Sequence, residues 1–334
     1  MVHSPKLFLL AVALLLVTEW TMAQGIVVDA SYVETASKGG ALIWDARDES
    51  DYLQGHIPGA VNIGNAGDIF RDANREDPPS AAAAARIFGS AGMDISSREV
   101  IVYTLRGDAI AYYAARMPEY YGGKHAKVYH GGIDDWKASG RRLETTAAKL
   151  PFVALTLTEG KGALGNKELI EGVRKGSAQI IDTRTPKEYS GEDIRAIRGG
   201  HVPGAVNIPY EQNWQDPAAA SKLVSGQVSN RDGMILKSTE DLKKLYAKLD
   251  PTKETILYCQ SGVRASESAA VLRDLGFTNV KIHEPSWLGY ASVLSAPAED
   301  EVFVNIGALN GRISSLQGRV KELEGEVMKL KPAK

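Results

Sequence analysis

The chain contains one cysteine among its 334 residues, Cys259. A disulfide within one molecule is therefore impossible. Cysteine and histidine do not cluster anywhere, so the sequence gives no reason to expect a metal ion, and no other cofactor is expected either. On cysteine count alone the single thiol could be reactive, paired with another molecule, or inert and buried.

An excess of charge of one sign is also missing. The net charge is −2 and 24% of the residues are charged, so the composition gives no reason to expect nucleic-acid binding. The one long apolar run lies at 7–17, and the small residues Thr21 and Ala23 follow it, three positions and one position before Gln24. This pattern predicts a signal peptide over residues 1–23, and hence a secreted or periplasmic protein without a membrane attachment after cleavage. An uncleaved N-terminal anchor is the alternative.

An internal duplication determines the architecture. Segments 55–63 and 200–208 read GHIPGAVNI and GHVPGAVNI, which is nine positions with one conservative change. An apolar run that ends in Asp-x-Arg precedes each of them, at 42–47 and 180–184. Self-similarity of this kind indicates two copies of one domain.

Both copies share the same predicted order of elements. Short apolar runs at 99–103 and 255–258 predict strands, and alanine-rich helical patterns follow each at 109–115 and 265–275. Strands that alternate with helices predict an α/β domain with a small, mostly parallel sheet flanked by helices. We place the first domain at 24–145, a linker at 146–165 and the second domain at 166–296.

The segment around Cys259 is suited to nucleophilic chemistry. The cysteine follows a predicted strand and opens a loop in which Gly262 allows the backbone to bend closely. We expect Arg264, the loop N–H groups and the N-terminus of the next helix, near Ala265, to favour the thiolate over the thiol. The predicted catalytic residues are Cys259 and Arg264, and the predicted loop residues that hold the sulfur are Gln260, Ser261, Gly262 and Val263.

These motifs, in this order and duplicated, resemble the tandem two-domain form of the rhodanese (sulfurtransferase) family over about residues 26–294. The resemblance implies that Cys259 takes sulfane sulfur from thiosulfate or a similar anionic donor as a persulfide. It then implies transfer to a thiophilic acceptor such as cyanide or a thiol. A preference for 3-mercaptopyruvate is one alternative, and an exported sulfur carrier or binding module with little turnover is another. Four residues separate Cys259 from Arg264, whereas cysteine phosphatases with a related loop use five, so phosphatase activity is disfavoured.

The first copy lacks the nucleophile. Alignment of the strand ends places Thr104 opposite Cys259, and Gly107 is kept in the loop while the final arginine is not. A threonine hydroxyl cannot carry persulfide sulfur, so we expect this copy to be inactive and to wall the active-site cleft. A structural role is favoured for Arg47 and Arg106.

Donor recognition is predicted from the second copy. An insertion at 190–199 adds Arg195 and Arg198, and Arg184 belongs to the Asp-x-Arg motif. The resemblance implies that arginines of this region bind the anionic donor, and the alternative for each is a solvated surface arginine. We also expect Ser286 and Trp287 to line the mouth of the cleft.

Two histidines recur in the repeated Gly-His motif, His56 and His201. Because one of them belongs to the copy without a cysteine, a structural hydrogen bond is favoured over catalysis for both.

After Pro297 the pattern changes to a coiled-coil helix, predicted over 299–334. Apolar residues follow spacings of three and four in an unbroken heptad seam of Ile306, Leu309, Ile313, Leu316, Val320, Leu323, Val327 and Leu330. Ile or Val at one core position of the heptad and Leu at the other favours a coiled coil of two parallel helices. We therefore predict a homodimer through residues 306–330. The alternative is a helix that packs along its own chain.

Overall fold

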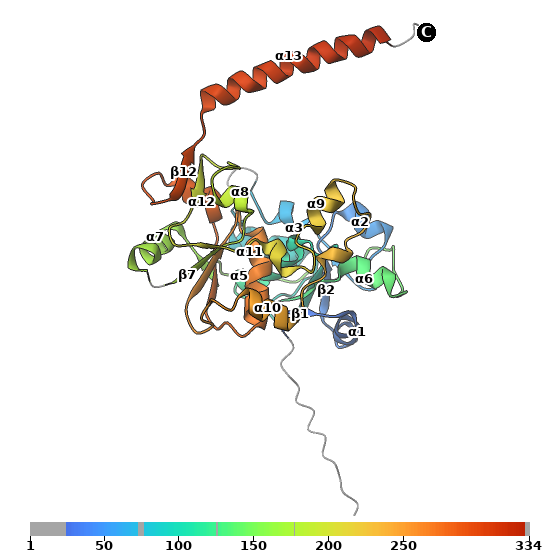
Figure 1. Ribbon diagram of the computed structural model, residues 1–334. Helices are drawn as coiled ribbons and strands as arrows, with labels where there is room; N and C mark the ends of the chain where they lie inside the picture. The colour runs from blue at the N-terminus through green and yellow to red at the C-terminus, as the bar shows by residue number, and fades with distance from the viewer. Residues whose placement is uncertain (1–24, 73–76, 125, 177, 331–334) are drawn as a thin grey trace, which may run out of the picture.

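The computed structural model describes residues 25–72, 77–124, 126–176 and 178–330. Two α/β domains lie side by side, and a C-terminal helix projects away from them (Figure 1). The signal peptide predicted for residues 1–23 lies outside the described residues.

The first domain is built on a five-stranded sheet in the order β1-β5-β4-β2-β3. All neighbouring strands in it are parallel. Its strands are β1 (Val27–Val28), β2 (Leu42–Asp45), β3 (Val61–Asn62), β4 (Val100–Tyr103) and β5 (Lys127–Tyr129). Its helices are α1 (Ala30–Lys38), α2 (Glu49–Gln54), α3 (Ala66–Ile69), α4 (Ala81–Ser90), α5 (Ala109–Tyr120) and α6 (Gly132–Ala138).

The second domain repeats the arrangement with the order β6-β11-β10-β7-β9, again all parallel. Its sheet strands are β6 (Ala163–Leu164), β7 (Gln179–Asp182), β9 (Val206–Asn207), β10 (Thr255–Tyr258) and β11 (Val280–His283). Its α-helices are α7 (Asn166–Lys175), α8 (Pro186–Tyr189), α9 (Ala219–Val224), α10 (Thr239–Leu245), α11 (Val263–Asp274) and α12 (Ser286–Ser292). Two 3-10 helices, η1 (Tyr210–Asn213) and η2 (Asp232–Met234), join this group.

The two sheets have equivalent topologies and registers. Asp45 pairs with Tyr103 at the end of β2 and β4, and Asp182 pairs with Tyr258 at the end of β7 and β10. The predicted fold, two α/β domains with parallel sheets that arose by duplication, is confirmed. The equivalence also places Thr104 where the second domain has Cys259.

Local sequence explains where these elements begin. β2, β4 and β10 are buried along their whole length, as expected for parallel strands covered by helices on both faces. Helices begin at side-chain caps: the Asp29 carboxylate accepts from the Tyr32 N–H, and Asp108 accepts from Ile110. Thr185 and Glu188 form a reciprocal capping box at α8.

The two domains meet mainly through α5 and α11. Ala270 of α11 is part of the buried core of the first domain, and Val263 packs against that core. The small side chain of Ala270 allows α11 to approach the first domain closely. At one end of α11, the Asp274 carboxylate accepts the backbone N–H groups of Ile26 and Val27, at 2.6 and 3.0 Å, and so ties β1 to the second domain.

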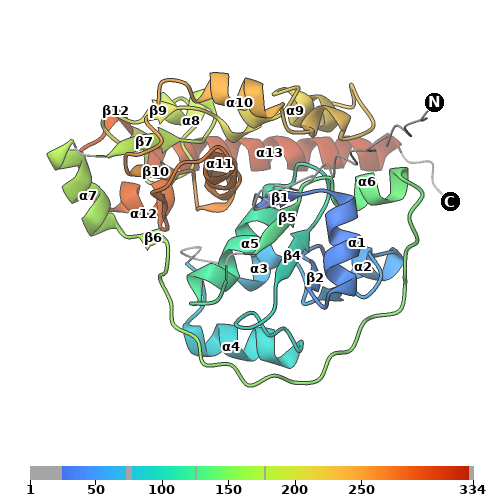
Figure 2. The same ribbon diagram turned by 90° about the horizontal axis from the view of Figure 1, so that it is seen from below.

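The connection between the domains follows the surface of the first domain (Figure 2). Leu150, Leu155 and Leu157 pack against the core of that domain. The N–H of Val153 donates to the carbonyl of Gly89 at 3.1 Å. A side chain at Gly89 would meet the Val153 carbonyl, so the glycine permits this close approach.

The C-terminal extension differs from its predicted boundary. Residues Glu299–Phe303 form a strand, β12, that pairs antiparallel with β8 (Arg198–His201). The helix α13 runs over Ile306–Leu330 and so begins later than predicted. The backbone carbonyls and amides of β12 pair with those of β8. This pairing explains why residues 299–303 form a strand instead of a helix.

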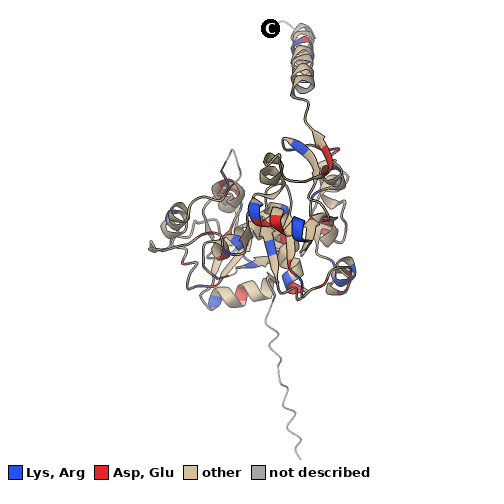
Figure 3. Ribbon diagram, turned by 90° about the vertical axis from the view of Figure 1, so that its left-hand side faces the viewer, with Lys and Arg blue, Asp and Glu red and all other residues tan. Residues whose placement is uncertain are grey.

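Where its side chains are described, the apolar seam of α13 does not pack on its own chain. Ile313, Leu316, Val320, Leu323 and Val327 are all exposed along the helix. Acidic and basic residues are interspersed along α13 (Figure 3). Among the described helices, none combines the length and apolar character needed to cross a membrane.

Candidate active site

Cys259 lies at the carboxyl end of β10, where the chain turns into α11. Gly262 caps that helix with φ +87°, a left-handed conformation that glycine adopts without steric cost. This turn aims the Gly262 N–H at the thiol, and the N to Sγ distance is 3.1 Å. A backbone donor and the N-terminus of a 12-residue helix therefore face the sulfur. The positive ends of these backbone dipoles are therefore directed at Sγ.

The cysteine is held from behind by the start of α12. The N–H of Trp287 donates to the Cys259 carbonyl at 2.9 Å, and the N–H of Leu288 donates to the Gln260 carbonyl at 3.0 Å. The Cys259 N–H donates to the Ser286 hydroxyl at 3.3 Å. Cys259 is 1% exposed, so it forms the base of the loop rather than its rim.

The prediction that Ser286 and Trp287 line the cleft mouth is wrong, because both are buried behind the loop. The Trp287 indole donates to the Arg198 carbonyl, and the Arg184 guanidinium stacks 4.6 Å from the centroid of its ring. These residues orient the cysteine strand instead of contacting solvent.

Ser286 adopts a left-handed backbone conformation, with φ +48°. The equivalent residue of the first domain is Gly132, with φ +57°. A non-glycine residue in this region costs roughly 1–3 kcal/mol. The cost accompanies a specific contact: the Ser286 hydroxyl bridges the Cys259 N–H and the His283 carbonyl.

Arg264 forms a bidentate ion pair with Glu188. Both guanidinium–carboxylate N to O distances are 2.7 Å, and the Glu188 side chain is 2% exposed. Burial alone would raise the pKa of Glu188, but the hydrogen bonds and charge of Arg264 outweigh it, and the pKa falls to about 2. Burial acts to lower the pKa of Arg264, whereas the Glu188 hydrogen bonds and the nearby Cys259 raise it. The expected free positive charge at Arg264 is therefore balanced by Glu188, and Arg264 anchors the end of the loop.

The other loop residues connect the site to neighbouring elements. The Gln260 side-chain amide donates to the Arg195 carbonyl at 2.7 Å and joins the loop to the insertion. The Ser261 hydroxyl accepts from Arg71 of the first domain at 2.5 Å. Val263 packs against the first domain's core. The first domain thus walls the loop, as the sequence predicted.

The three arginines predicted to bind the donor have different surroundings. Arg184 is 1% exposed and bonds the Asp182 carboxylate and the Gly200 carbonyl. Arg198 is equally buried and donates to the carbonyls of α12 and its following turn. Both side chains hold the fold together, so the structure does not support donor binding by them. Arg195 is 54% exposed beside Glu188 and is accessible to an anion.

The motif arginine and histidine of both copies are structural. In the first domain, Arg47 repeats the arrangement of Arg184 by bonding Asp45 and a glycine carbonyl. His56 stacks on Tyr52 and His201 on Tyr189, and one ring nitrogen of each histidine bonds the tyrosine carbonyl. The structural interpretation of both histidines is confirmed.

The equivalent loop of the first domain has the same glycine turn but no cysteine. Gly107 adopts φ +69°, like Gly262, but Thr104 fills the cysteine position and is buried. Arg106 bonds Asp135 and Asp232, so it joins the two domains instead of serving an anion.

Sequence reasoning missed several residues at the site. Glu188 lies outside the loop motif, although the Thr-x-x-Glu capping pattern marks the helix that carries it. Arg71 and Arg116 belong to the first domain and match no motif. Arg116 pairs with Glu284 at 2.6 Å beside the loop.

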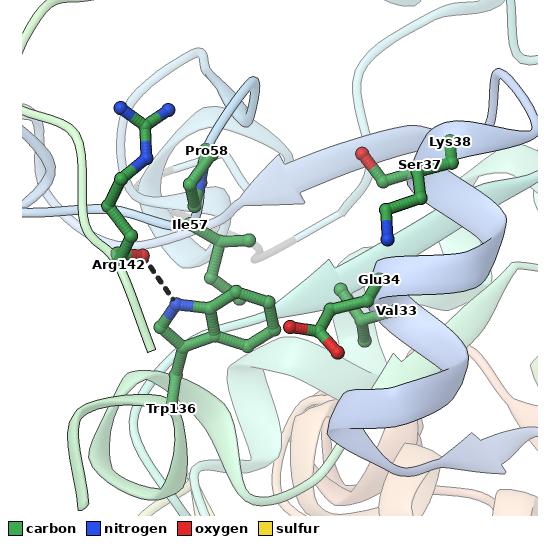
Figure 4. Close-up of a pocket in the computed structure, with 8 residues that line it drawn as sticks. All are labelled: Val33, Glu34, Ser37, Lys38, Ile57, Pro58, Trp136 and Arg142. Carbon is green, nitrogen blue, oxygen red and sulfur yellow. Dashed lines mark hydrogen bonds between the residues drawn. The ribbon is translucent and has the colours of Figure 1, made fainter. Parts of the chain in front are cut away.

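Two hollows elsewhere on the surface are separate from the thiol. A cavity of about 270 Å³ lies on the first domain between α1, the Gly-His motif and Trp136, whose indole donates to the Arg142 carbonyl (Figure 4). Another, of about 360 Å³, lies between the domains and reaches Val263 and Arg264. Neither is lined by Cys259, so we assign the sulfur chemistry to neither.

The family model for the rhodanese-like domain matches residues 29–139 and 165–292. The chain belongs to the rhodanese-like family. A protein of Mycolicibacterium smegmatis provisionally named a thiosulfate sulfurtransferase is 31% identical over 289 residues, which cover 82% of this chain and 97% of that protein. The thiosulfate sulfurtransferase of Corynebacterium glutamicum is 30% identical over 82% of this chain and 90% of its own length.

Solved structures support the same fold. The anaerobic ergothioneine biosynthesis enzyme of Chlorobium limicola, in complex with trimethyl histidine, matches with a TM-score of 0.68. The match is 19% identical and covers 82% of this chain and 69% of that chain. At this identity the likeness concerns the fold alone.

Replacement of Glu188 by Gln should loosen the loop. Removing one partner of a buried ion pair costs roughly 3–5 kcal/mol, so we expect a large fall in the free energy of unfolding and at least a tenfold loss of turnover. Because the pKa of Glu188 is lowered, its stabilising contribution is present above about pH 4.5 and is lost as the pH falls toward about 2. Thermal melts should therefore show that the difference in melting temperature between wild type and Glu188→Gln becomes smaller as the pH falls through that range. A difference in melting temperature that does not change with pH would contradict this account.

Replacement of Ser286 by Gly tests the strained contact. Relief of about 1 kcal/mol of backbone strain should offset much of the lost hydrogen bond, so the melting temperature should change by only a few degrees. Turnover should fall roughly tenfold, because the Cys259 N–H loses its acceptor. Ser292→Gly, on the exposed end of α12, is the control. Unchanged turnover in Ser286→Gly would show that the hydroxyl does not position the cysteine.

Proposed function

We propose that this enzyme moves sulfane sulfur from thiosulfate to a thiophilic acceptor through a persulfide on Cys259. The observation that carries the proposal is the Gly262 N–H directed at Sγ at the N-terminus of α11. The sulfurtransferase relatives support the reaction class. A variant of EanB that carries a cysteine persulfide shares the fold, at a TM-score of 0.67 and 18% identity over 82% of this chain and 70% of that chain.

The reaction is a double displacement. The Cys259 thiolate attacks the outer sulfur of thiosulfate, the sulfur–sulfur bond of the donor breaks, and sulfite leaves with the bonding electron pair. The cysteine then carries a persulfide anion. Cyanide attacks its terminal sulfur, thiocyanate forms, and the thiolate returns. In both steps negative charge develops on the sulfur atoms at Cys259. The loop amides and the N-terminus of α11 face these atoms and can stabilise that charge.

Export is also our proposal, since the sequence of residues 1–23 has the features of a signal peptide. The physiological acceptor would then be encountered in the periplasm or outside the cell.

Treatment of the wild type with thiosulfate should add the mass of one sulfur atom to the intact protein, and Cys259→Ser should gain nothing. Steady-state assays with thiosulfate and cyanide should show turnover that this substitution abolishes. Parallel assays with 3-mercaptopyruvate distinguish the alternative donor. No mass gain with either donor would contradict the persulfide proposal, and mass gain with negligible turnover would favour a sulfur carrier over an enzyme.

We further propose that α13 forms a parallel two-stranded coiled coil with α13 of a second copy. The seam at positions 313, 316, 320, 323 and 327 is exposed, so it is available to a partner. In a parallel pair, Arg319 would face Glu324 of the other copy, and the opposite charges favour this register. Exposed apolar side chains continue onto β12 at Val302 and Phe303. A second copy presents the same seam and is the occupant that this pattern fits.

Two substitutions in the seam, Leu316→Glu and Leu323→Glu, should convert the dimer to a monomer without loss of turnover. The matched control adds the same charge on the outer face, as Ser314→Glu and Ser315→Glu. Sedimentation analysis should give twice the chain mass for wild type and control, and one chain mass for the seam variant. A wild type with one chain mass would contradict the coiled coil. Truncation is a poorer test if it removes β12, which pairs with the insertion.

A further inference from the structure

We propose that the ion pair between Arg116 of the first domain and Glu284 of the second sets the charge beside the cysteine loop and thereby allows an anionic sulfur donor to react there. This inference rests on the proposed sulfur transfer and makes Arg116, from the domain that lacks the cysteine, a specificity-determining residue. Arg116 Nη1 lies 2.6 Å from one oxygen of the Glu284 carboxylate, and Nη2 donates to the other oxygen at 2.8 Å. The pair therefore joins the two domains with matched charges.

The pair lies against the turn that directs an N–H at the thiol. A side chain added at Gly262 would come within 3.9 Å of both Arg116 Nη2 and Glu284 Oε1, and within 3.7 Å of the Glu284 carbonyl. The Gly262 nitrogen is 3.1 Å from Sγ of Cys259. Together these contacts place the Glu284 carboxylate within about 10 Å of the sulfur. A charge at Glu284 without its partner would therefore act on any anion that reaches the thiol.

Both charges are shielded from water, so each depends on the other. The side chains of Arg116 and Glu284 are 6% and 11% exposed. Burial acts to lower the pKa of Arg116, but the charge and hydrogen bond of Glu284 outweigh it, and the pKa is raised. The rings of Tyr113 and Tyr120 also face the guanidinium, with centroids 5.4 and 5.7 Å from its carbon. Burial raises the pKa of both tyrosines, and it lowers the pKa of the neighbouring His283 to about 3, so these three groups are neutral.

The equivalent position of the first domain makes a neutral contact. The registers of the two sheets place His130 where the second domain has Glu284. His130 also crosses the domain boundary, because its Nε2–H donates to the Met234 carbonyl at 2.8 Å, and its Nδ1 accepts from the Tyr112 hydroxyl. Burial lowers the pKa of His130 to about 4, so this group carries no charge. The charged version of the contact thus lies beside the loop that has the cysteine.

Removal of either partner would leave a charge of opposite sign next to Gly262. Without Arg116 the loop faces the carboxylate alone, which repels an anion. Without Glu284 it faces the guanidinium alone, which attracts one. A unit charge within about 10 Å of a reacting anion, at an effective dielectric constant of about 20, changes the rate of that anion by roughly tenfold. A loss of packing would instead slow anionic and neutral reagents alike.

The test compares alkylation of Cys259 by the anion iodoacetate with alkylation by uncharged iodoacetamide at the same pH. The ratio of the two second-order rate constants cancels the fraction of thiolate, so it reports the charge near the sulfur. We expect Arg116→Gln to lower this ratio by about tenfold and Glu284→Gln to raise it severalfold, whereas the double variant should return to within about threefold of wild type. Arg116→Lys, which keeps the positive charge, should stay close to wild type.

Arg273→Gln is the matched control. Arg273 also pairs across the domain boundary, with Glu119 at 3.1 Å, but it lies about 16 Å along α11 from Gly262. We expect its alkylation ratio to match wild type. Persulfide formation from thiosulfate, followed by rapid-mixing mass analysis, should slow by about tenfold in Arg116→Gln and stay within about twofold of wild type in Arg273→Gln.

The possible failures can be told apart. If wild type gains no sulfur from thiosulfate, the proposed function itself fails, while the alkylation ratios still test the charge at the loop. If the two single variants shift the ratio in the same direction, or leave it unchanged, the charge role of the pair is overturned. If Arg116→Gln does not fold, Glu284→Gln decides the question: a raised ratio supports the role, and an unchanged or lowered ratio contradicts it.

Discussion

The bidentate ion pair between Arg264 and Glu188 fixes the catalytic loop to the body of the second domain. Glu188 is itself held by the capping box at Thr185, so the anchor is continuous with the sheet that carries Asp182. With the first turn of α11 fixed and β10 fixed by its neighbours, the short loop between them has little freedom. Gly262 must then adopt its left-handed turn, and that turn aims an N–H at the thiol. The surroundings of the Cys259 thiol follow from this closure.

The two duplicated domains have the same fold but differ in the residue at the cysteine position. The first domain retains the glycine turn at Gly107 and the motif arginine at Arg47, yet it has Thr104 in place of a nucleophile. Its surface instead contacts the second domain beside the cysteine loop, where Arg71 bonds Ser261 and Arg116 pairs with Glu284. The interface of α5 and α11 therefore both stabilises the molecule and completes the surroundings of the sulfur.

Sequence alone predicted the fold well because the repeated motifs carry it. In each copy the apolar run that ends in Asp-x-Arg forms one buried strand, and the cysteine loop or its equivalent follows another, so two parallel sheets could be expected. Which arginines are buried and paired could not be predicted, because burial and ion pairing are set by partners distant in sequence. Arg184 and Arg198 have the right chemistry for an anion, but Asp182 and the α12 carbonyls occupy them. Arg71 lies 188 residues before Cys259 and no local pattern marks it.

The most direct test of the central claim is a crystal structure of the protein after treatment with thiosulfate. The account predicts one additional sulfur atom bonded to Cys259 Sγ, enclosed by the loop, with backbone N–H groups from Gln260 to Arg264 directed at it and the Arg264–Glu188 pair intact. An unmodified Cys259, or a terminal sulfur turned away from the loop amides, would contradict it.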